Sequence, residues 1–165
     1  MTRGLILGRF QPFHLGHMEL IKSMIRKNIL PIICIGSAQH SNTLENPFTA
    51  DERGKMIVAV MECLNCEYEL YQVPDINNYD LYVSHLKTFV SDFDLVCSGN
   101  SLVQRLFTEA GDVVIKPKII NREAWEGSAI RLAMKAGGDW EAAVPIQVVE
   151  IINRIDGSER LKNLT

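Results

Sequence analysis

Two histidines and an arginine lie close together near the N-terminus, in a pattern that can hold phosphate. His14 and His17 are three residues apart, Gly16 stands between them, and Arg9 comes five residues before His14. This spacing lets both imidazoles face one ligand at the start of a helix, where unpaired N–H groups and the helix dipole attract anions. Gly16 allows a close approach of the backbone. The group therefore predicts a phosphate site.

Two other interpretations of the histidines are weighed against phosphate binding. Either ring taken alone could simply cap or pack the turn. The pair could also bind zinc, but no carboxylate or cysteine follows at a spacing that completes a zinc site. Cys63 and Cys66 have C-x-x-C spacing without a second pair or a nearby histidine, so ordinary buried thiols are favoured over a metal or redox role.

The elements that must position these residues follow an α/β pattern. Short apolar runs alternate with longer segments of helical periodicity, which is typical of β-α-β units around a parallel sheet. We expect strands at 5–7, 32–36 (opened by Pro31), 69–73, 95–97 and within 113–120, and helices at about 16–27, 50–64 (capped by Thr49), 80–90, 101–110, from 127–128 onward, and one with Pro145 in its first turn. The expected fold is a doubly wound, Rossmann-like parallel sheet with helices on both faces and a helical C-terminal tail, forming one domain over 1–165.

Ligands of such sheets bind at the carboxyl ends of the strands. The segments that follow the expected strands are polar or contain glycine, and they are 8–17, 36–41, 74–78, 98–100 and 121–128. They predict a cleft at this edge. Gly99 and Asn100 lie at one strand end, where the backbone could approach a nucleoside; a simple turn is the alternative.

Composition excludes several classes of protein. The 165 residues are 47% hydrophobic and 22% charged, which is typical of a globular chain. A formal net charge of −3 argues against a general nucleic-acid binder. No apolar run approaches the length of a membrane span or a signal peptide, so we expect a cytoplasmic protein without a membrane or nucleic-acid partner.

The first motif also carries a resemblance. The run from Gly8 to His17 reads G-R-F-Q-P-F-H-L-G-H, which resembles the HxGH nucleotidyltransferase superfamily and, within it, the archaeal type of nicotinamide mononucleotide (NMN) adenylyltransferase. Further matches cover nearly the whole chain, at 35–39 (I-G-S-A-Q), 45–50 (E-N-P-F-T-A), 98–100 (S-G-N) and 127–131 (G-S-A-I-R).

The resemblance implies transfer of AMP from ATP to the 5′-phosphate of NMN, which gives NAD and pyrophosphate. It assigns His14, His17, Arg9 and Arg131 to the catalytic site, as positively charged or donor groups without a nucleophilic role. It assigns Gly8, Phe10, Gly16, Gly99, Asn100, Gly127 and Ser128 to ATP, and Ser37, Gln39, Asp75 and Tyr82 to the nicotinamide nucleotide. It also implies Mg²⁺ with ATP, without a protein metal ligand, and a homo-oligomer, which in archaeal relatives is often a hexamer.

Arg131 is placed about one turn into the helix that Gly127 and Ser128 open, so its guanidinium can reach an anion at that helix start. A surface salt bridge is the alternative for this arginine. Ser128 would add a hydroxyl and a main-chain N–H to the β or γ phosphate.

Some positions depart from the family pattern. Tyr82 stands where relatives often have a tryptophan that stacks on the nicotinamide ring, and a tyrosine can also stack. Asn42 replaces a usual histidine, and Leu132 and Ala133 replace usual arginines. Nicotinic acid mononucleotide or another phosphomonoester therefore remains an alternative acceptor, and a nucleotide-binding regulator without turnover is the alternative from another class.

Overall fold

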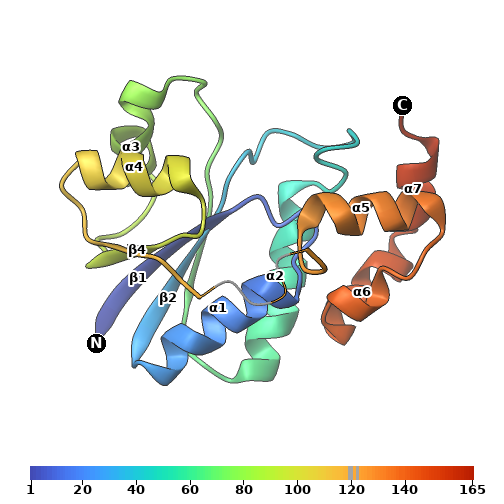
Figure 1. The fold of residues 1–165 in the computed structure, drawn as a ribbon, viewed down its shortest axis with the longest axis horizontal. Helices are drawn as coiled ribbons and strands as arrows, with labels where there is room; N and C mark the ends of the chain where they lie inside the picture. Colours follow the sequence, from blue (N-terminus) through green and yellow to red (C-terminus); the bar gives the residue numbers. More distant parts are fainter. Residues whose placement is uncertain (119–120, 122) are drawn as a thin grey trace.

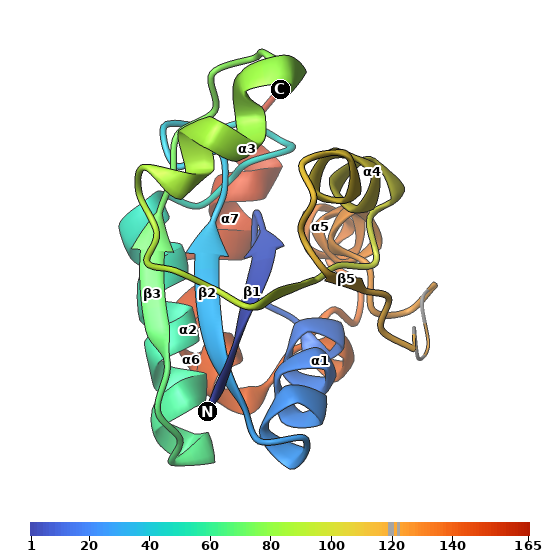
Figure 2. The same ribbon diagram turned by 90° about the vertical axis from the view of Figure 1, so that its left-hand side faces the viewer.

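The computed structural model describes residues 1–118, 121 and 123–165, and its centre is a parallel sheet. The strands are β1 (Thr2–Gly8), β2 (Ile29–Ile35), β3 (Glu69–Gln72), β4 (Leu95–Cys97) and β5 (Val114–Ile115). Their order is β3-β2-β1-β4-β5, and each neighbouring pair runs parallel. From β1 the chain adds β2 and then β3 on one side, and it later adds β4 and β5 on the other side of β1. The direction of strand addition therefore reverses at β1 (Figure 2). The predicted doubly wound sheet is confirmed.

Helices cover both faces of this sheet (Figure 1). They are α1 (Leu15–Arg26), α2 (Ala50–Leu64), α3 (Tyr79–Lys87), α4 (Ser101–Glu109), α5 (Gly127–Ala136), α6 (Ile146–Arg154) and α7 (Gly157–Asn163), with a 3₁₀ turn at Glu141–Ala143. α3 and α4 pack together on one face, while α1 and α2 lie on the other. The tail of α5, α6 and α7 extends this second layer, because α6 packs against α2 and α7 packs against α5 and α6. The expected helical tail is confirmed.

Alternation along the strands divides the core between the two faces. Ile6 and Ile33 pack with α1, α2 and the tail. Leu5 and Ile32, their neighbours in the chain, pack with α3 and α4. Successive strand residues point to opposite faces, so central strands that are covered twice must be apolar throughout, as β1 and β2 are.

Side-chain caps begin the helices α2, α3 and α4, and the sequence predicts that of α2. The Thr49 hydroxyl accepts a hydrogen bond from the Glu52 N–H at 3.1 Å, and the Glu52 carboxylate accepts one from the Thr49 N–H at 2.9 Å. This capping box confirms the predicted start of α2. Asn78 caps α3, and Asn100 caps α4 by accepting from two main-chain N–H groups.

The start of β2 differs from the prediction. Pro31 does not open the strand but lies inside it, because β2 begins at Ile29. The carbonyl of Ile35 faces β3, and the N–H of Gly36 faces β1. The main-chain groups of successive strand residues face opposite neighbours, so every second residue before Ile35 also faces β3. The nitrogen of Pro31 therefore faces β3. Pairing with β3 begins only at Ile32. The missing N–H of the proline therefore removes no ladder bond.

Three further boundaries shift. α3 begins at Tyr79 and ends at Lys87, so it is shorter than expected at its C-terminal end. β5 is limited to Val114–Ile115 and ends before Pro117; the expected strand residues 119 and 120 lie outside the described residues. Pro145 immediately precedes α6 and serves as its N-cap instead of lying in its first turn.

Among the described residues, no helix combines the length and the apolar character that crossing a membrane requires. The longest helix, α2, has 15 residues and carries charged side chains.

Candidate active site

The turn between β1 and α1 fixes the orientation of both histidines. His14 is the N-cap of α1, and its Nδ1 accepts a hydrogen bond from the Gly16 N–H at 3.1 Å. His17 Nδ1 accepts one from the His14 N–H, also at 3.1 Å. A ring nitrogen that accepts a hydrogen bond carries no proton, so in each neutral ring the proton lies on Nε2. Two Nε2–H donors are thus held side by side.

Both rings are neutral at pH 7. Burial, and then the positive charge of Arg131, lower the pKa of His14 to about 4. Burial, and then the neighbouring His14, lower the pKa of His17 well below its ordinary value. The two rings stack with their centroids 3.7 Å apart, a distance at which two imidazolium charges repel strongly.

Two phenylalanine rings pack against the His17 ring. The ring centroids of Phe10 and Phe13 lie 4.6 Å and 5.3 Å from that of His17. Both phenylalanine side chains are fully buried. Phe10 was expected to contact ATP, but its side chain packs in the core, so only its main chain can face a ligand.

Arg131 reaches back from α5 to the same turn. Its Nη1 donates to the Gln11 carbonyl at 2.9 Å. A Cβ added to Gly127 would lie 2.9 Å from this nitrogen, so glycine leaves room for the guanidinium above the helix start. Burial and the charge of Arg9 lower the pKa of Arg131. Arg9 itself is exposed, and cations this close together favour a bound anion.

Gly16 leaves room for His14 in the same way. A Cβ at this position would lie 2.9 Å from His14 Cε1 and 3.0 Å from its Nδ1. The ring could not then keep both its stacking and its hydrogen bond to the Gly16 N–H. The glycine between the histidines therefore positions His14 as well as allowing close approach of a ligand.

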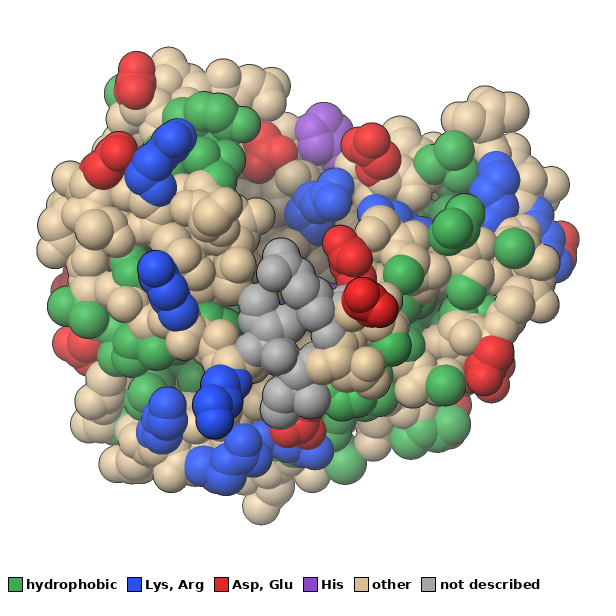
Figure 3. All heavy atoms as spheres, viewed as in Figure 1, with side chains coloured by type: hydrophobic (Ala, Val, Ile, Leu, Met, Phe, Trp, Pro, Cys, Tyr) green, Lys and Arg blue, Asp and Glu red, His purple; other side chains and the backbone are tan. Residues whose placement is uncertain are grey.

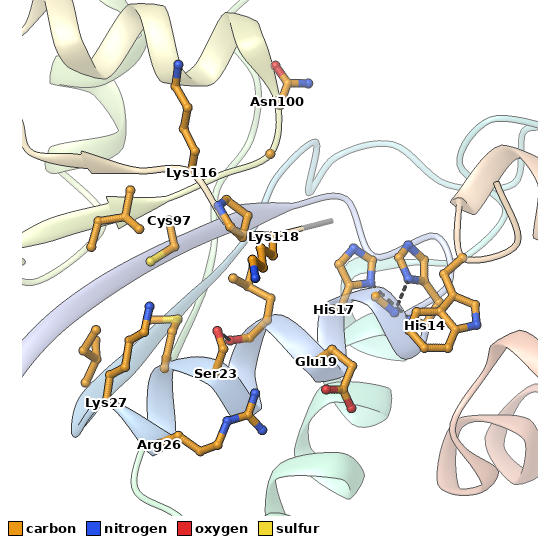
Figure 4. Close-up of a pocket in the computed structure, with 18 of the residues that line it drawn as sticks. His14, His17, Glu19, Ser23, Arg26, Lys27, Cys97, Asn100, Lys116 and Lys118 are labelled. Carbon is orange, nitrogen blue, oxygen red and sulfur yellow. Dashed lines mark hydrogen bonds between the residues drawn. The ribbon is translucent and has the colours of Figure 1, made fainter. Parts of the chain in front are cut away.

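A pocket of about 720 Å³ opens beside the histidines, between α1 and the segments that follow β4 and β5. His14 and His17 lie at one end of it, while Arg26 and Lys27 lie at the other (Figure 4). Lys118 reaches between them, and the apolar lining includes Met24, Ile29, Cys97 and Ile115. On the surface this face is hollowed between the part that carries α3 and α4 and the part that carries α5 to α7 (Figure 3). The shape and lining suit a nucleotide whose phosphates approach the histidines.

The structure brings several of the residues predicted for ATP to this pocket. Gly16, Gly99, Asn100 and Gly127 line it together with the two histidines. The side-chain oxygen of Asn100 accepts hydrogen bonds from two main-chain N–H groups of α4 and so caps this helix. Three other predicted residues do not line it: Gly8 accepts the Gly36 N–H across the sheet, Phe10 is buried, and Ser128 is exposed at the second position of α5.

The residues predicted for the nicotinamide nucleotide gather separately, beyond the ends of β2 and β3. The Ser37 hydroxyl donates to the Asp75 carboxylate at 2.6 Å. The Gln39 side-chain amide donates to the Asp75 carbonyl at 3.1 Å and accepts the Asp75 N–H at 3.0 Å. Burial, and then the charges of Cys34 and Asp75, raise the pKa of Tyr82. Ser37, Gln39, Asp75 and Tyr82 are therefore neighbours, as predicted, with Gln39 holding Asp75 in place.

Several residues of the site were not predicted. Trp125, Glu126 and Lys118 line the pocket, and Gln11 and Arg53 are buried beneath the loops after β1 and β2, which they bond. The Gln11 side-chain amide donates to the Phe48 carbonyl and accepts the Phe48 N–H, at 2.9 Å each. Trp125 and Glu126 fall in the predicted segment 121–128, so their position in the sequence already indicated that they lie near the cleft. Gln11 falls in the predicted segment 8–17, but its partner Phe48 lies far away in the sequence, so its role could not be predicted. Arg53 falls in none of the predicted segments.

Comparison with known proteins agrees with this geometry. A family model described as cytidylyltransferase-like matches residues 5–136. The nicotinamide-nucleotide adenylyltransferase of Thermoplasma volcanium is 47% identical, over 99% of this chain and 92% of its own. That of Archaeoglobus fulgidus is 45% identical, over 99% and 97%, and that of Methanolobus tindarius is 43% identical, over 100% and 95%.

The chain belongs to the nicotinamide-nucleotide adenylyltransferase family. Its membership confirms the resemblance that the first motif carries, and places it within the wider cytidylyltransferase-like family.

A solved structure shares the fold. The bifunctional NMN adenylyltransferase/ADP ribose pyrophosphatase of Francisella tularensis superposes with a TM-score of 0.74 at 18% identity, over 99% of this chain. The chain spans about half of that protein, 52% of its length. The likeness therefore concerns the architecture of the sheet and its helices.

Proposed function

We propose that the protein transfers AMP from ATP to the 5′-phosphate of nicotinamide mononucleotide and releases pyrophosphate, as a step of NAD synthesis. One observation carries this function: two neutral histidines, His14 and His17, present fixed Nε2 donors at one end of a nucleotide-sized pocket, close to Arg131 and Arg9. The names of full-length relatives at 43–47% identity agree with it.

The reaction needs positioning and charge stabilisation more than covalent help. An oxygen of the NMN phosphate attacks the α-phosphorus of ATP, a new P–O bond forms, and the bond from the α-phosphorus to the bridging oxygen of pyrophosphate breaks. The acceptor phosphate is already a dianion above about pH 6, so no protein base has to remove a proton. Nε2–H of His14 and His17 and the guanidinium of Arg131 then stabilise charge on the phosphate oxygens.

Mg²⁺ fits this scheme as an ion that arrives with ATP. When bound, it neutralises charge on the polyphosphate and is coordinated mainly by phosphate and water oxygens. In the part of the chain that the structure describes, no group of three or more His, Cys, Asp or Glu side chains is arranged to hold a metal ion. We therefore propose no protein ligand for it.

The acceptor side favours the amide over the acid form of the mononucleotide. Asp75 is held by Ser37 and Gln39 and lies near Tyr82, whose pKa its charge raises. A carboxylate here accepts hydrogen bonds from a carboxamide and repels a nicotinate carboxylate. Tyr82 offers an aromatic ring for stacking on the pyridine.

Two coarser features of the proposal concern the cell and the assembly. We propose that the enzyme acts in the cytoplasm. We propose no nucleic acid as a partner, because the net charge of the chain is −3. We also propose a homo-oligomer, in line with the family resemblance. Size-exclusion chromatography with light scattering gives the number of copies, and a monomer at micromolar concentration would contradict that part of the proposal.

Incubation of the purified protein with ATP, Mg²⁺ and NMN tests the function directly. We expect NAD and pyrophosphate in equal amounts, and a higher kcat/KM with NMN than with nicotinic acid mononucleotide. Binding of ATP without turnover of any phosphomonoester, at any pH or temperature tried, would instead indicate a nucleotide-binding regulator.

A further inference from the structure

Arg53 is a fully buried arginine that the reaction scheme does not use. It lies in the first turn of α2 and is 0% exposed. A guanidinium has five N–H donors, and each of them has a partner here. The acceptors are main-chain carbonyls of Thr49 (3.2 Å), Arg9 (2.9 Å), Gly36 (2.9 Å), Ser37 (3.2 Å) and His40 (3.2 Å). No carboxylate is bonded to it among the described residues.

Apart from that of Thr49, which is the N-cap of α2 itself, these carbonyls belong to the two loops that carry opposite halves of the site. Arg9 belongs to the turn after β1, which leads into His14 and His17. Gly36, Ser37 and His40 belong to the loop after β2, and Ser37 bonds the acceptor-side Asp75. The planar guanidinium, which extends from the first turn of α2, therefore bridges the turn after β1 and the loop after β2, beyond the point where the Gly36 N–H bonds the Gly8 carbonyl. Figure 1 shows α2 beside these two strands.

The guanidinium keeps its charge despite its burial. Burial, and then the charge of Arg9, lower the pKa of Arg53, while Asp75 and Glu52 raise it, and the result is about 10. The group is therefore a cation at neutral pH. All of its hydrogen bonds are charge-assisted, and such bonds are the stronger ones.

We propose that Arg53 is a positioning residue for adenylyl transfer: it holds the loops after β1 and β2 at the separation that places the acceptor phosphate in line with the α-phosphorus of ATP. The inference rests on the proposed function, since it names a requirement of the same reaction. Arg53 acts through the main chains of Arg9 and Ser37 and does not touch either substrate. Its effect therefore falls on the alignment of two bound substrates more than on the binding of each one.

Arg53→Lys tests this role, because lysine keeps the charge but offers three donors from one point in place of a five-donor fork. A misplacement of about 1 Å can reduce turnover about 10²-fold, so we expect kcat to fall by about 10²-fold. The dissociation constants of α,β-methylene-ATP and of NMN, each measured alone by calorimetry, should stay within about threefold of wild type, because each loop still binds its own ligand.

A matched control separates positioning from loss of stability. Val60→Ala removes buried methyl groups from the same helix, at a position that lies in the core. Assayed at temperatures where both variants are fully folded by circular dichroism, Val60→Ala should keep the wild-type kcat. A kcat for Arg53→Lys equal to that of Val60→Ala would overturn the proposal. Wild-type turnover is measured first, so its absence would count against the proposed function and not against Arg53.

The wild-type protein gives an independent test that also applies if Arg53→Lys does not fold. In protein labelled with ¹⁵N-arginine, the Nη protons of Arg53 should resist exchange with solvent at neutral pH, because all are buried and bonded. Since the guanidinium touches both loops, α,β-methylene-ATP and NMN should each shift these signals. Shifts with both ligands support the proposal, whereas signals that respond to one ligand or to neither contradict it.

Discussion

The imidazoles of His14 and His17 are held as neutral donors by the main chain of their own helix start. Each Nδ1 accepts a main-chain N–H, which leaves Nε2–H as the group presented to a ligand. Burial disfavours the charged form of both rings. The protein thus avoids burying two adjacent cations and still offers donors to the oxygens of a polyphosphate.

Replacement of His17 tests its role as a donor. His17→Ala should lower kcat by about 10²-fold or more, as is typical when one donor to a developing oxyanion is lost. His17→Asn keeps an acceptor close to the Nδ1 position but lacks the Nε2 donor, so it should be equally slow and better folded. Steady-state kinetics and thermal melts measure both effects, and a near-normal rate in His17→Asn would show that the Nε2 donor is not required.

Asp75 is expected to control the choice between amide and acid acceptors. Asp75→Asn can still accept a hydrogen bond from Ser37 but removes the negative charge, so the ratio of kcat/KM for nicotinic acid mononucleotide to that for NMN should rise by about tenfold or more. The ratio is taken within one variant, so changes in folding cancel. Ser37→Ala leaves the carboxylate in place and should keep the wild-type ratio; an unchanged ratio in Asp75→Asn would place selectivity elsewhere.

At the scale of elements, the features that could be predicted are those written locally in the sequence. The apolar runs of β1 and β2, the capping box of Thr49 and Glu52, and the turn from Gly8 to His17 each depend on residues a few positions apart. The boundary at Pro31 was missed because it depends on where β3 begins to pair. The buried side chains of Gln11 and Arg53 were missed for the same reason, since their partners come from other loops.

A bidentate ion pair joins α7, in the C-terminal helical tail, to α2. Arg160 of α7 donates from Nη1 and Nη2 to the two oxygens of Glu52 at 2.7 Å and 2.8 Å, and also donates to the Pro47 carbonyl at 3.0 Å. Because α7 packs against α5, this pair also supports the helix that carries Arg131. Both side chains are only about one-fifth exposed, at 22% and 19%.

We expect Glu52→Gln to lower the free energy of unfolding by about 1 to 3 kcal/mol, because it weakens charge-assisted bonds and leaves Arg160 without a charged partner. Urea unfolding measures the change. Lys162→Gln, which removes the exposed pair with Glu159, is the control and should cost less than about 0.5 kcal/mol. Equal effects of the two substitutions would mean that the tail does not depend on this contact.

At the scale of the whole molecule, the two halves of the site lie beside β1, where the strand order reverses. The pocket beside α1 lies on the side of β4 and β5, and the cluster around Asp75 lies on the side of β2 and β3. A ligand that joins the two sides must cross the turn after β1, which carries the histidines. In the proposed reaction, the reacting phosphates therefore lie at the switch point of the sheet.

The buried histidines make global stability depend on pH. The pKa of His14 is about 4 in the folded protein, and the ordinary value of 6.5 applies to the unfolded chain. The unfolded chain therefore binds the proton more readily. Stability is fully present above pH 6.5 and falls as the pH drops toward 4, by about 3 kcal/mol for this residue alone. Urea unfolding at pH 7.5, 5.5 and 4.5 measures the loss.

The double variant His14→Gln/His17→Gln is the control for this pH dependence, because glutamine does not titrate. Its stability should change much less between pH 7.5 and 4.5. The pKa of Glu52 and of Glu69 is lowered from 4.5, so stability from these carboxylates is lost mainly below this range. A double variant as sensitive to pH as wild type would contradict the burial of neutral histidines.

The fate of labelled phosphate tests the central claim most directly. The protein is incubated with NMN, Mg²⁺ and ATP labelled with ³²P at the α-phosphate, and in parallel with ATP labelled at the γ-phosphate. The account predicts that the α label appears in NAD and the γ label in pyrophosphate. Label from the γ-phosphate in the nucleotide product or in free phosphate, or no α label in NAD, would contradict adenylyl transfer at this site.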